Sequence, residues 1–244
     1  MSRYHATFYH FLISFAIFIA ITYVIVYHWY PDFFFAIDGG WEGMRIIIGV
    51  DLILGPTLTF IVFKSGKPGL KLDLTLIGIL QAVCLTIGLS IVYLERPIFF
   101  VYYEKHFYSS NLDTFANYNQ PPPNPYEYSE DLPAQVISLL PDNPIEEADL
   151  RLELYKDGIP PWVYKRTYKN LKDYLDKVIS EGADEMELQN RDEDGNLEKW
   201  LANYGGKFDD YAFIPIHSRY RDAHLGIRKS DKSFVDVVEI PPPL

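Results

Sequence analysis

The chain has 244 residues, of which 48% are hydrophobic and 23% charged, and its formal net charge at pH 7 is −11. This acidic charge excludes the class of proteins that bind nucleic acid through a basic surface. Its one cysteine, Cys84, excludes a framework of intrachain disulfides.

The charge is unevenly distributed along the chain. Residues 1–96 contain six basic and six acidic side chains, which leaves 16 basic and 27 acidic side chains for residues 97–244. A neutral, apolar first part and an acidic second part predict two domains, a transmembrane domain (1–96) and a soluble domain (97–244).

Three apolar stretches in the first part predict transmembrane helices. The hydrocarbon core of a bilayer requires about 20 apolar residues in a helix, and residues 6–27, 45–63 and 74–94 approach or reach this length. The loop between the second and third stretches carries Lys64, Lys67 and Lys71. The loop before Arg45 contains three acidic residues and neither lysine nor arginine. The positive-inside rule then places the N-terminus in the cytoplasm and residues 97–244 outside, in the periplasm of a Gram-negative bacterium.

The second stretch contains polar and small residues at helical spacing. Asp51, Gly55 and Thr59 lie at i, i+4 and i+8, so a helix presents them on one face. Pro56 removes a backbone donor, which predicts a kink one turn earlier at Leu52. Small and polar faces pack against other helices rather than against lipid.

The third stretch offers a matching face, and an antiparallel alignment predicts which residues meet. The face consists of Gly78, Gln81, Leu85 and Gly88. The alignment places Gly55 near Cys84 and Asp51 near Gly88, where close approach of the backbones is expected. An acidic residue inside a membrane indicates an ion pathway, a docking point for another membrane helix, or a packing role within the bundle. In the packing role, Asp51 is hydrogen-bonded to Tyr23, to Gln81 or to an arginine, Arg45 or Arg96.

The second part predicts an α+β domain. Its helices are expected at residues 131–140, 144–158, 163–182 and 195–205, and its strands at 98–103, 211–220, 223–230 and 233–242. The last three strands predict a small C-terminal antiparallel sheet, which the strand at 98–103 is free to join. Pro97 is expected to end or kink the third membrane helix.

Motifs for catalysis and for cofactors are missing from the sequence. It contains no P-loop, GxSxG, HExxH or CxxC pattern, so we expect neither an enzyme nor a cofactor. Asn190, Asp192 and Asp194 match the start of an EF-hand loop, but Leu201 stands where the loop needs a glutamate. We interpret this segment as an acidic turn before a helix, with weak calcium binding as the alternative.

One block of the sequence resembles a known family. "DGGWEGMRIIIGVDLILGPTLTFIVF", "KPGLKLDL", Gln81 and "YLERPIFFVYYEKHF", within residues 30–108, are similar to the TfpX/TfpZ (FimB-like) type IV pilin accessory proteins. The matching motif positions are Gly39, Gly40, Asp51, Gly55, Pro56, Thr59, Lys67, Asp73, Gln81, Arg96 and Pro97.

The resemblance implies a non-enzymatic protein of the bacterial inner membrane. Such a protein has a type IV pilin as its partner, and it assists assembly or stability of the pilin or modulates pilus display and retraction. The alternative from the residues alone is a membrane-anchored periplasmic sensor or ligand-binding module.

Overall fold

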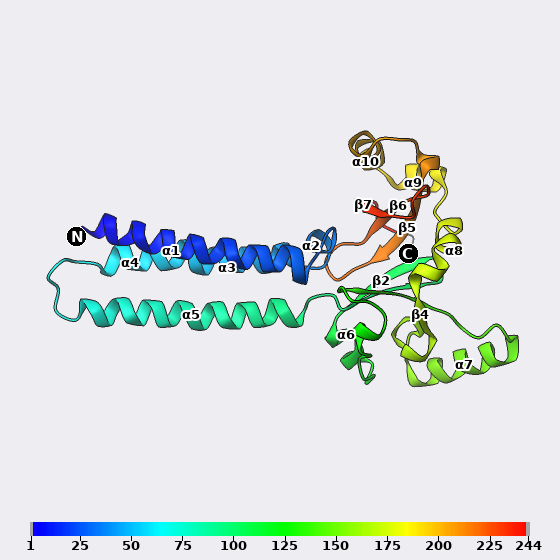
Figure 1. Cartoon of the computed structure of the whole chain (residues 1–244), viewed down its shortest axis with the longest axis horizontal. Coiled ribbons are helices and arrows are strands. Elements are labelled where there is room, and N and C mark those ends of the chain that lie inside the picture. The colour runs from blue at the N-terminus through cyan, green and yellow to red at the C-terminus, as the bar shows by residue number, and fades with distance from the viewer. Residues whose placement is uncertain (1, 243–244) are drawn as a thin grey trace. The chain divides into compact units, whose positions relative to one another are not determined.

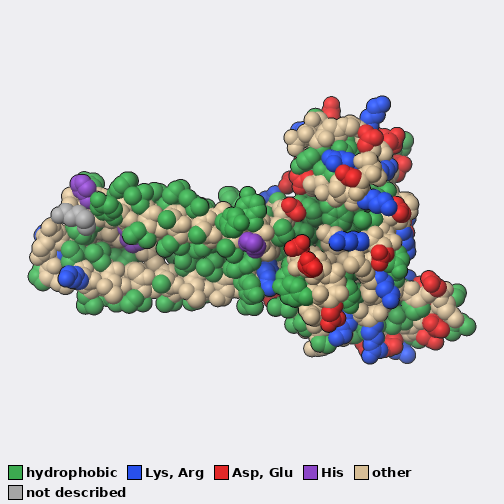
Figure 2. Space-filling view, in the orientation of Figure 1, with side chains coloured by type: hydrophobic (Ala, Val, Ile, Leu, Met, Phe, Trp, Pro, Cys, Tyr) green, Lys and Arg blue, Asp and Glu red, His purple; other side chains and the backbone are tan. Residues whose placement is uncertain are grey.

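The computed structural model describes residues 2–242, which divide into two compact units, residues 2–96 and 97–242. The first unit consists of helices, and the second contains every strand among the described residues (Figure 1). In the space-filling view hydrophobic side chains cover the first unit, whereas most charged side chains lie on the second (Figure 2).

Three long helices form the first unit, and each is long and apolar enough to cross a membrane. The first is α1 (Arg3–Val24), which a π-helical turn extends to Trp29. The second is composed of α3 (Gly40–Ile47), a π-helical segment (Ile48–Leu54) and α4 (Gly55–Val62), and the third is α5 (Leu70–Leu94). The three predicted apolar stretches are therefore helical, and the second helix begins five residues before its predicted start at Arg45.

A π-helical segment surrounds Leu52, where a kink was expected. Its hydrogen bonds reach back five residues, and the N–H of Gly55 donates to the carbonyl of Val50. Pro56 then lies in the first turn of α4, where a missing backbone N–H costs little. The helix absorbs the proline by widening, and Asp51 lies within the widened segment.

A turn built on two glycines precedes the second long helix. The short helix α2 (Phe34–Ile37) ends there, and Gly39 has a φ of 98°, a left-handed conformation that favours glycine. Gly40 lies so close to α2 that a Cβ atom on it would be 2.5 Å from Cδ2 of Phe35. The two glycines thus serve different purposes, one for backbone conformation and the other for close packing.

A seven-stranded sheet forms the centre of the second unit, with the order β4-β3-β1-β2-β5-β6-β7. Its strands are β1 (Phe99–Tyr103), β2 (His106–Ser110), β3 (Ala134–Ser138), β4 (Tyr168–Asn170), β5 (Tyr211–His217), β6 (Ala223–Arg228) and β7 (Phe234–Val238). The three C-terminal strands and β1 were predicted, and β1 does join them in one sheet. The sheet is mixed rather than antiparallel, because β1 runs parallel to β3 and β2 runs parallel to β5.

Helices cover the sheet and complete its core. They are α6 (Leu112–Asn117), α7 (Pro144–Asp157), α8 (Leu175–Ser180), α9 (Glu185–Arg191) and α10 (Asn196–Tyr204). One hydrophobic cluster gathers around Phe99, Phe115 and Tyr168, and another gathers around Trp200 and Phe213. The predicted helices at 144–158 and 195–205 are confirmed as α7 and α10.

Two predicted helices are wrong. Residues 131–140 contain strand β3, because a short apolar run does not distinguish a strand from a helix when both of its faces are buried. Residues 163–182 contain two short 3₁₀ helices, Lys165–Thr167 and Leu171–Tyr174, with strand β4 between them, and an α-helix begins only at Leu175. Before that point, Thr167 donates to the carbonyl of Tyr164 and Asn170 accepts from the N–H of Lys172, and such local hydrogen bonds compete with a helix.

Candidate functional site

A buried polar cluster lies inside the first unit, between its three long helices. Ser14 of α1, Asp51 of the π-helical segment, Thr59 of α4 and Gln81 of α5 are each at most 7% exposed. Asp51, Gly55 and Thr59 were predicted to share a face, and the structure brings that face against both α1 and α5. In the buried centre of an apolar helical unit such a cluster requires internal hydrogen bonds, because its apolar surroundings offer none.

Asp51 and Gln81 form the centre of this cluster. Nε2 of Gln81 donates a hydrogen bond of 3.1 Å to Oδ1 of Asp51. The Gln81 side chain crosses directly over Gly55, where a Cβ atom would lie 1.8 Å from Nε2. Gly55 is therefore required for the hydrogen bond, because any side chain there would displace the Gln81 amide.

The other oxygen of Asp51 is left without a donor. Oδ2 is buried and has no hydrogen-bond partner among the described residues. His10 and Ser14 of α1 also face the carboxylate, and Nδ1 of His10 is hydrogen-bonded to Oγ1 of Thr59 at 2.5 Å. Buried side-chain acceptors usually have a hydrogen-bond donor, so this carboxylate is an unusual group for the centre of an apolar helical unit.

The sequence analysis missed the contribution of α1 to this site. His10 and Ser14 were not among the predicted site residues, and the structure places His10 against Thr59 inside the unit. The signal in the sequence was the spacing of His10 and Ser14, which lie at i and i+4 and therefore on one helix face.

Several predicted contacts of the cluster differ from the observed ones. Gly55 faces Gln81 instead of Cys84, a register shift of about one helical turn. No atom would lie within 4 Å of a Cβ on Gly88, so the expected close approach there is not observed. Bulky Val92 instead packs on Gly43, where an added Cβ atom would lie 2.5 Å from a Val92 methyl group, and this contact fixes the register of α5.

The proposed alternative partners of Asp51 also lie elsewhere. Tyr23 is 57% exposed and packs against Tyr27 and His28. The guanidinium of Arg45 lies over the ring of Trp41, and that of Arg96 lies over the ring of Tyr93.

The remaining motif positions of the first unit stabilise its ends. Lys67 and Asp73 form a 2.6 Å ion pair across the loop before α5, and both side chains are about one-third exposed or more. Arg96 donates to the carbonyl of Tyr93 just beyond the end of α5. The helix ends at Leu94, before Arg96 and Pro97, as the proline predicted.

Of the EF-hand-like residues, Asp192 caps a helix in the structure. Asn190 lies within α9, and both carboxylate oxygens of Asp192 accept backbone hydrogen bonds at the start of α10, from Asn196 and Leu197. The backbone carbonyl of Asp194 accepts from Nζ of Lys199. Within residues 2–242, no group of three or more histidine, cysteine, aspartate or glutamate side chains is arranged to hold a metal ion.

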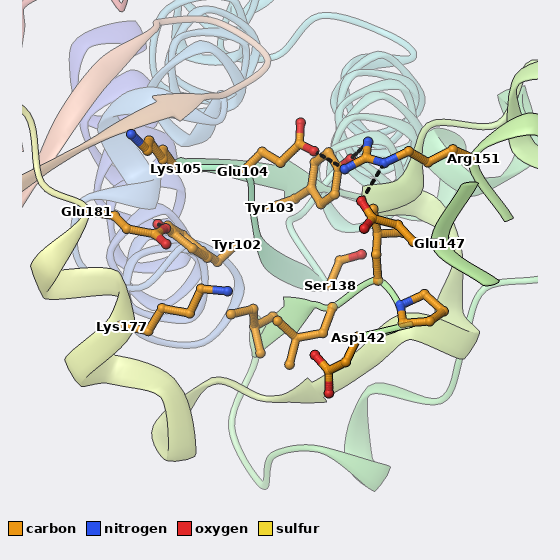
Figure 3. A pocket seen from close by; sticks show the side chains of 14 residues that line it. Tyr102, Tyr103, Glu104, Lys105, Ser138, Asp142, Glu147, Arg151, Lys177 and Glu181 are labelled. Atoms are coloured by element: carbon orange, nitrogen blue, oxygen red, sulfur yellow. Dashed lines mark hydrogen bonds and ion pairs between the residues drawn. The ribbon is translucent and has the colours of Figure 1, made fainter. Parts of the chain in front are cut away.

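A polar cavity of about 530 Å³ lies in the second unit (Figure 3). It is formed at the carboxyl ends of the parallel strands β1 and β3, a position where ligands often bind to parallel sheets. Its walls include Tyr103, Asp142, Arg151 and Lys177, and Lys177 extends its amino group into the cavity (Figure 3). No local pattern in the sequence indicates this cavity, because it depends on the parallel pairing of β1 with β3.

Arg151 joins α7 to the wall of this cavity. Its guanidinium donates to Glu147 at 2.8 Å, to Glu104 at 2.6 Å and to the hydroxyl of Tyr103 at 3.0 Å. Burial and the neighbouring Glu104 carboxylate raise the pKa of Tyr103 to about 12. Burial opposes ionisation of Glu104, but the hydrogen bonds from Arg151 and Tyr103 outweigh it and lower the pKa of Glu104.

The turn between β1 and β2 is strained beside the same cavity. Glu104 and Lys105 have φ values of 44° and 68°, a left-handed conformation that favours glycine. Two-residue hairpin turns of this kind usually contain asparagine and glycine. The side chain of Glu104, in this turn, forms a 2.6 Å ion pair with Arg151 of α7.

Comparison with known proteins identifies relatives of the chain. No family model and no solved structure matches it. Three proteins of Dichelobacter nodosus match over 96 residues, which is 38% of this chain. The fimbrial assembly protein of serogroup E1 is 35% identical and that of serogroup I is 33% identical, and the match spans 37% of the length of each.

The third relative is covered more fully. The fimbrial assembly protein of serogroups C1 and C2 is 33% identical, and the match spans 72% of its length. This level of identity over most of a relative establishes a common family. The chain belongs to the family of these fimbrial assembly proteins.

Proposed function

We propose that this protein is a membrane-anchored accessory factor of type IV fimbrial assembly, which binds the fimbrial subunit, the pilin, and catalyses no reaction. The relationship to the fimbrial assembly proteins supports the process. The observation that carries the proposal is the buried polar cluster, in which hydrogen bonds of Gln81 with Asp51 and of His10 with Thr59 join three apolar helices.

The three helices are proposed to cross the inner membrane. The Lys67 loop then lies in the cytoplasm and Pro97–Leu244 in the periplasm, following the positive-inside rule. A pilin that waits in the membrane presents an apolar helix to the bilayer and a globular head outside it. This protein offers a matching pair of units, with an apolar surface on the helices and a charged surface on the sheet domain (Figure 2).

The polar cluster is proposed to fix the shape of the helical unit, and the outer surface of that unit to meet the pilin helix. Asp51 is 4% exposed, so a second protein has no direct access to its carboxylate in this arrangement. Membrane helices associate through packing and hydrogen bonds rather than through burial of apolar area. A shape fixed by internal hydrogen bonds would therefore determine which helix fits.

Co-purification of pilin with the full-length chain tests this function. The chain is extracted from membranes of the producing bacterium in a neutral detergent, and pilin is expected to be recovered with it. Asp51→Asn keeps an oxygen that accepts from Gln81, and it is expected to keep pilin binding. Asp51→Leu removes both side-chain oxygens and is expected to reduce pilin binding. Pilin recovery no greater than with an unrelated three-span membrane protein would contradict the function. Equal recovery with Asp51→Leu would contradict only the role of the cluster.

A second candidate function is a membrane-anchored ligand-binding or sensor module. The cavity beside Arg151 and Lys177 favours it, since a polar cavity at the ends of parallel strands can hold a small molecule. The two functions differ in what they predict for cells that lack the chain. If the chain is a sensor, cells that lack it still assemble fimbriae in at least one growth condition. If it is an assembly factor, such cells fail to assemble fimbriae in every condition.

A further inference from the structure

One end of the helical unit gathers basic side chains. At this end, which we call the loop end, α1 begins, α4 ends and α5 begins (Figure 1). Arg3 lies in the first turn of α1, Lys64 follows the end of α4, and Lys71 lies in the first turn of α5. All three are exposed, and we call them the basic cluster.

Contacts within the unit hold the basic cluster at the loop end. The guanidinium of Arg3 lies 5.7 Å from the ring centre of Phe60, which is four residues before Lys64. The N–H of Lys67 donates to the carbonyl of Lys64 at 3.1 Å, and the N–H of Leu70 donates to the carbonyl of Lys67 at 3.3 Å. Two consecutive turns therefore connect Lys64 to the start of α5.

The positive charge of the basic cluster is not neutralised by acidic side chains. Residues 1–31 contain no aspartate or glutamate, and residues 52–94 contain one, Asp73. The carboxylate of Asp73 forms its 2.6 Å ion pair with Lys67, which is outside the cluster. Within the described part of the chain, none of the three cluster residues forms an ion pair with an acidic side chain. Three cations therefore remain free to bind an anion.

The opposite end of the helical unit has no such excess of positive charge. Its acidic side chains outnumber its basic ones, with Asp32, Asp38, Glu42 and Glu95 against Arg45 and Arg96. Electrostatic attraction therefore directs an anion to the loop end.

Exposed apolar side chains lie beside the basic cluster on each of the three helices. Tyr4 of α1 is 71% exposed, Ile61 of α4 is 68% exposed and Leu72 of α5 is 62% exposed. Each lies at most three residues along the chain from a member of the cluster. A ligand that covers both kinds of surface has an anionic head and apolar chains. A free phosphate ion would leave the apolar side chains uncovered.

We propose that the basic cluster binds the headgroup of an anionic phospholipid, whose acyl chains lie on the neighbouring apolar surface. This inference rests on the proposed crossing of the membrane by the three helices, which places the loop end among lipid headgroups. It does not involve pilin, so loss of pilin binding and loss of lipid binding are separate results. Each lysine or arginine near an anionic lipid surface strengthens binding by a factor of about five.

Binding of two lipids to the full-length chain tests this site. The chain is produced in cells without pilin and purified in a neutral detergent. Phosphatidylglycerol or phosphatidylcholine with the same acyl chains is then added, and bound lipid is counted by native mass spectrometry. Phosphatidylglycerol is expected to bind at least about tenfold more tightly. Inorganic phosphate at the same concentration is expected not to displace it, because phosphate has no acyl chains.

Three double variants of the chain complete the test. Lys64→Gln with Lys71→Gln is expected to weaken binding of phosphatidylglycerol at least about tenfold. Lys64→Arg with Lys71→Arg keeps both charges and is expected to bind like the wild type. The matched control, Lys165→Gln with Lys172→Gln, removes two exposed charges from the sheet domain and is also expected to bind like the wild type.

Three results would overturn the proposal. The first is equal affinity of the two glutamine double variants for phosphatidylglycerol. The second is equal binding of the two lipids by the wild type. The third is displacement of phosphatidylglycerol by inorganic phosphate, which would identify the ligand as a free anion.

Discussion

Gly55→Ala is expected to lower the free energy of unfolding of the helical unit by about 1–3 kcal/mol, because it removes the donor of a buried polar acceptor. The new Cβ would lie 1.8 Å from Nε2 and 2.4 Å from Cδ of Gln81. The glutamine side chain can swing away, but Oδ1 of Asp51 then loses its hydrogen bond, and Oδ2 already has none among the described residues. Unfolding by a denaturing detergent, followed by circular dichroism, measures the effect.

Two comparisons isolate the cause of this loss. Gly78→Ala is the matched control, since no atom lies within 4 Å of a Cβ at Gly78, and it is expected to be neutral or stabilising by up to about 1 kcal/mol. On the background of Gln81→Ala, the Gly55→Ala change is expected to cost almost nothing further, because the steric conflict is gone. Additive losses in the double variant would show that Gly55 acts through another contact.

Acidification from about pH 7 to about pH 4 is expected to destabilise the sheet domain by about 3 kcal/mol through His224 alone. His224 is 1% exposed, and its Nδ1 donates to the carbonyl of Ile240 at 2.7 Å. Burial lowers its pKa from 6.5 to about 4, with Arg191, His106 and His217 acting in the same direction. The folded domain therefore holds this imidazole neutral.

The direction of this pH dependence follows from proton binding. Well above pH 6.5 the imidazole is neutral in both the folded and the unfolded state and contributes no pH dependence. As the pH falls from 6.5 towards 4, the unfolded chain takes up a proton that the folded domain does not, so the unfolded state is favoured. Urea titrations at pH 7 and pH 4 measure the change in the free energy of unfolding. His224→Gln keeps a donor for the carbonyl of Ile240, and its change between the two pH values is expected to be smaller by about 3 kcal/mol. The same dependence in both proteins would exclude His224 as its source.

The sequence predicted the parts of this fold that depend on local patterns. The apolar stretches marked the three long helices, and the alternating strands at the C-terminus marked β5, β6 and β7. Strand β3 was taken for a helix because its identity depends on pairing with β1 and β4, which are distant in the sequence. The mixture of parallel and antiparallel pairs in the sheet was missed for the same reason, because the pairing of strands depends on residues that are distant in the sequence.

The sequence predicted which residues of the candidate site share a face of one helix, but it did not predict the contacts between helices. Helical spacing grouped Asp51, Gly55 and Thr59 correctly, because these residues belong to one element. The predicted alignment of the second helix with α5 was displaced by about one turn. The contact of Val92 with Gly43 determines the observed alignment, and helical periodicity does not show which of several small residues makes the close contact. His10 and Ser14 were missed for a related reason, since the rotation of α1 about its axis is decided by packing.

Fimbriation of cells that lack this chain tests the proposed function most directly. Its gene is deleted in the bacterium that produces it, and surface fimbriae are counted by electron microscopy in several growth conditions. The proposed function predicts that fimbriae are largely lost in every condition and return when the wild-type chain is supplied from a plasmid. Fimbriae in normal number on the deleted cells would contradict it.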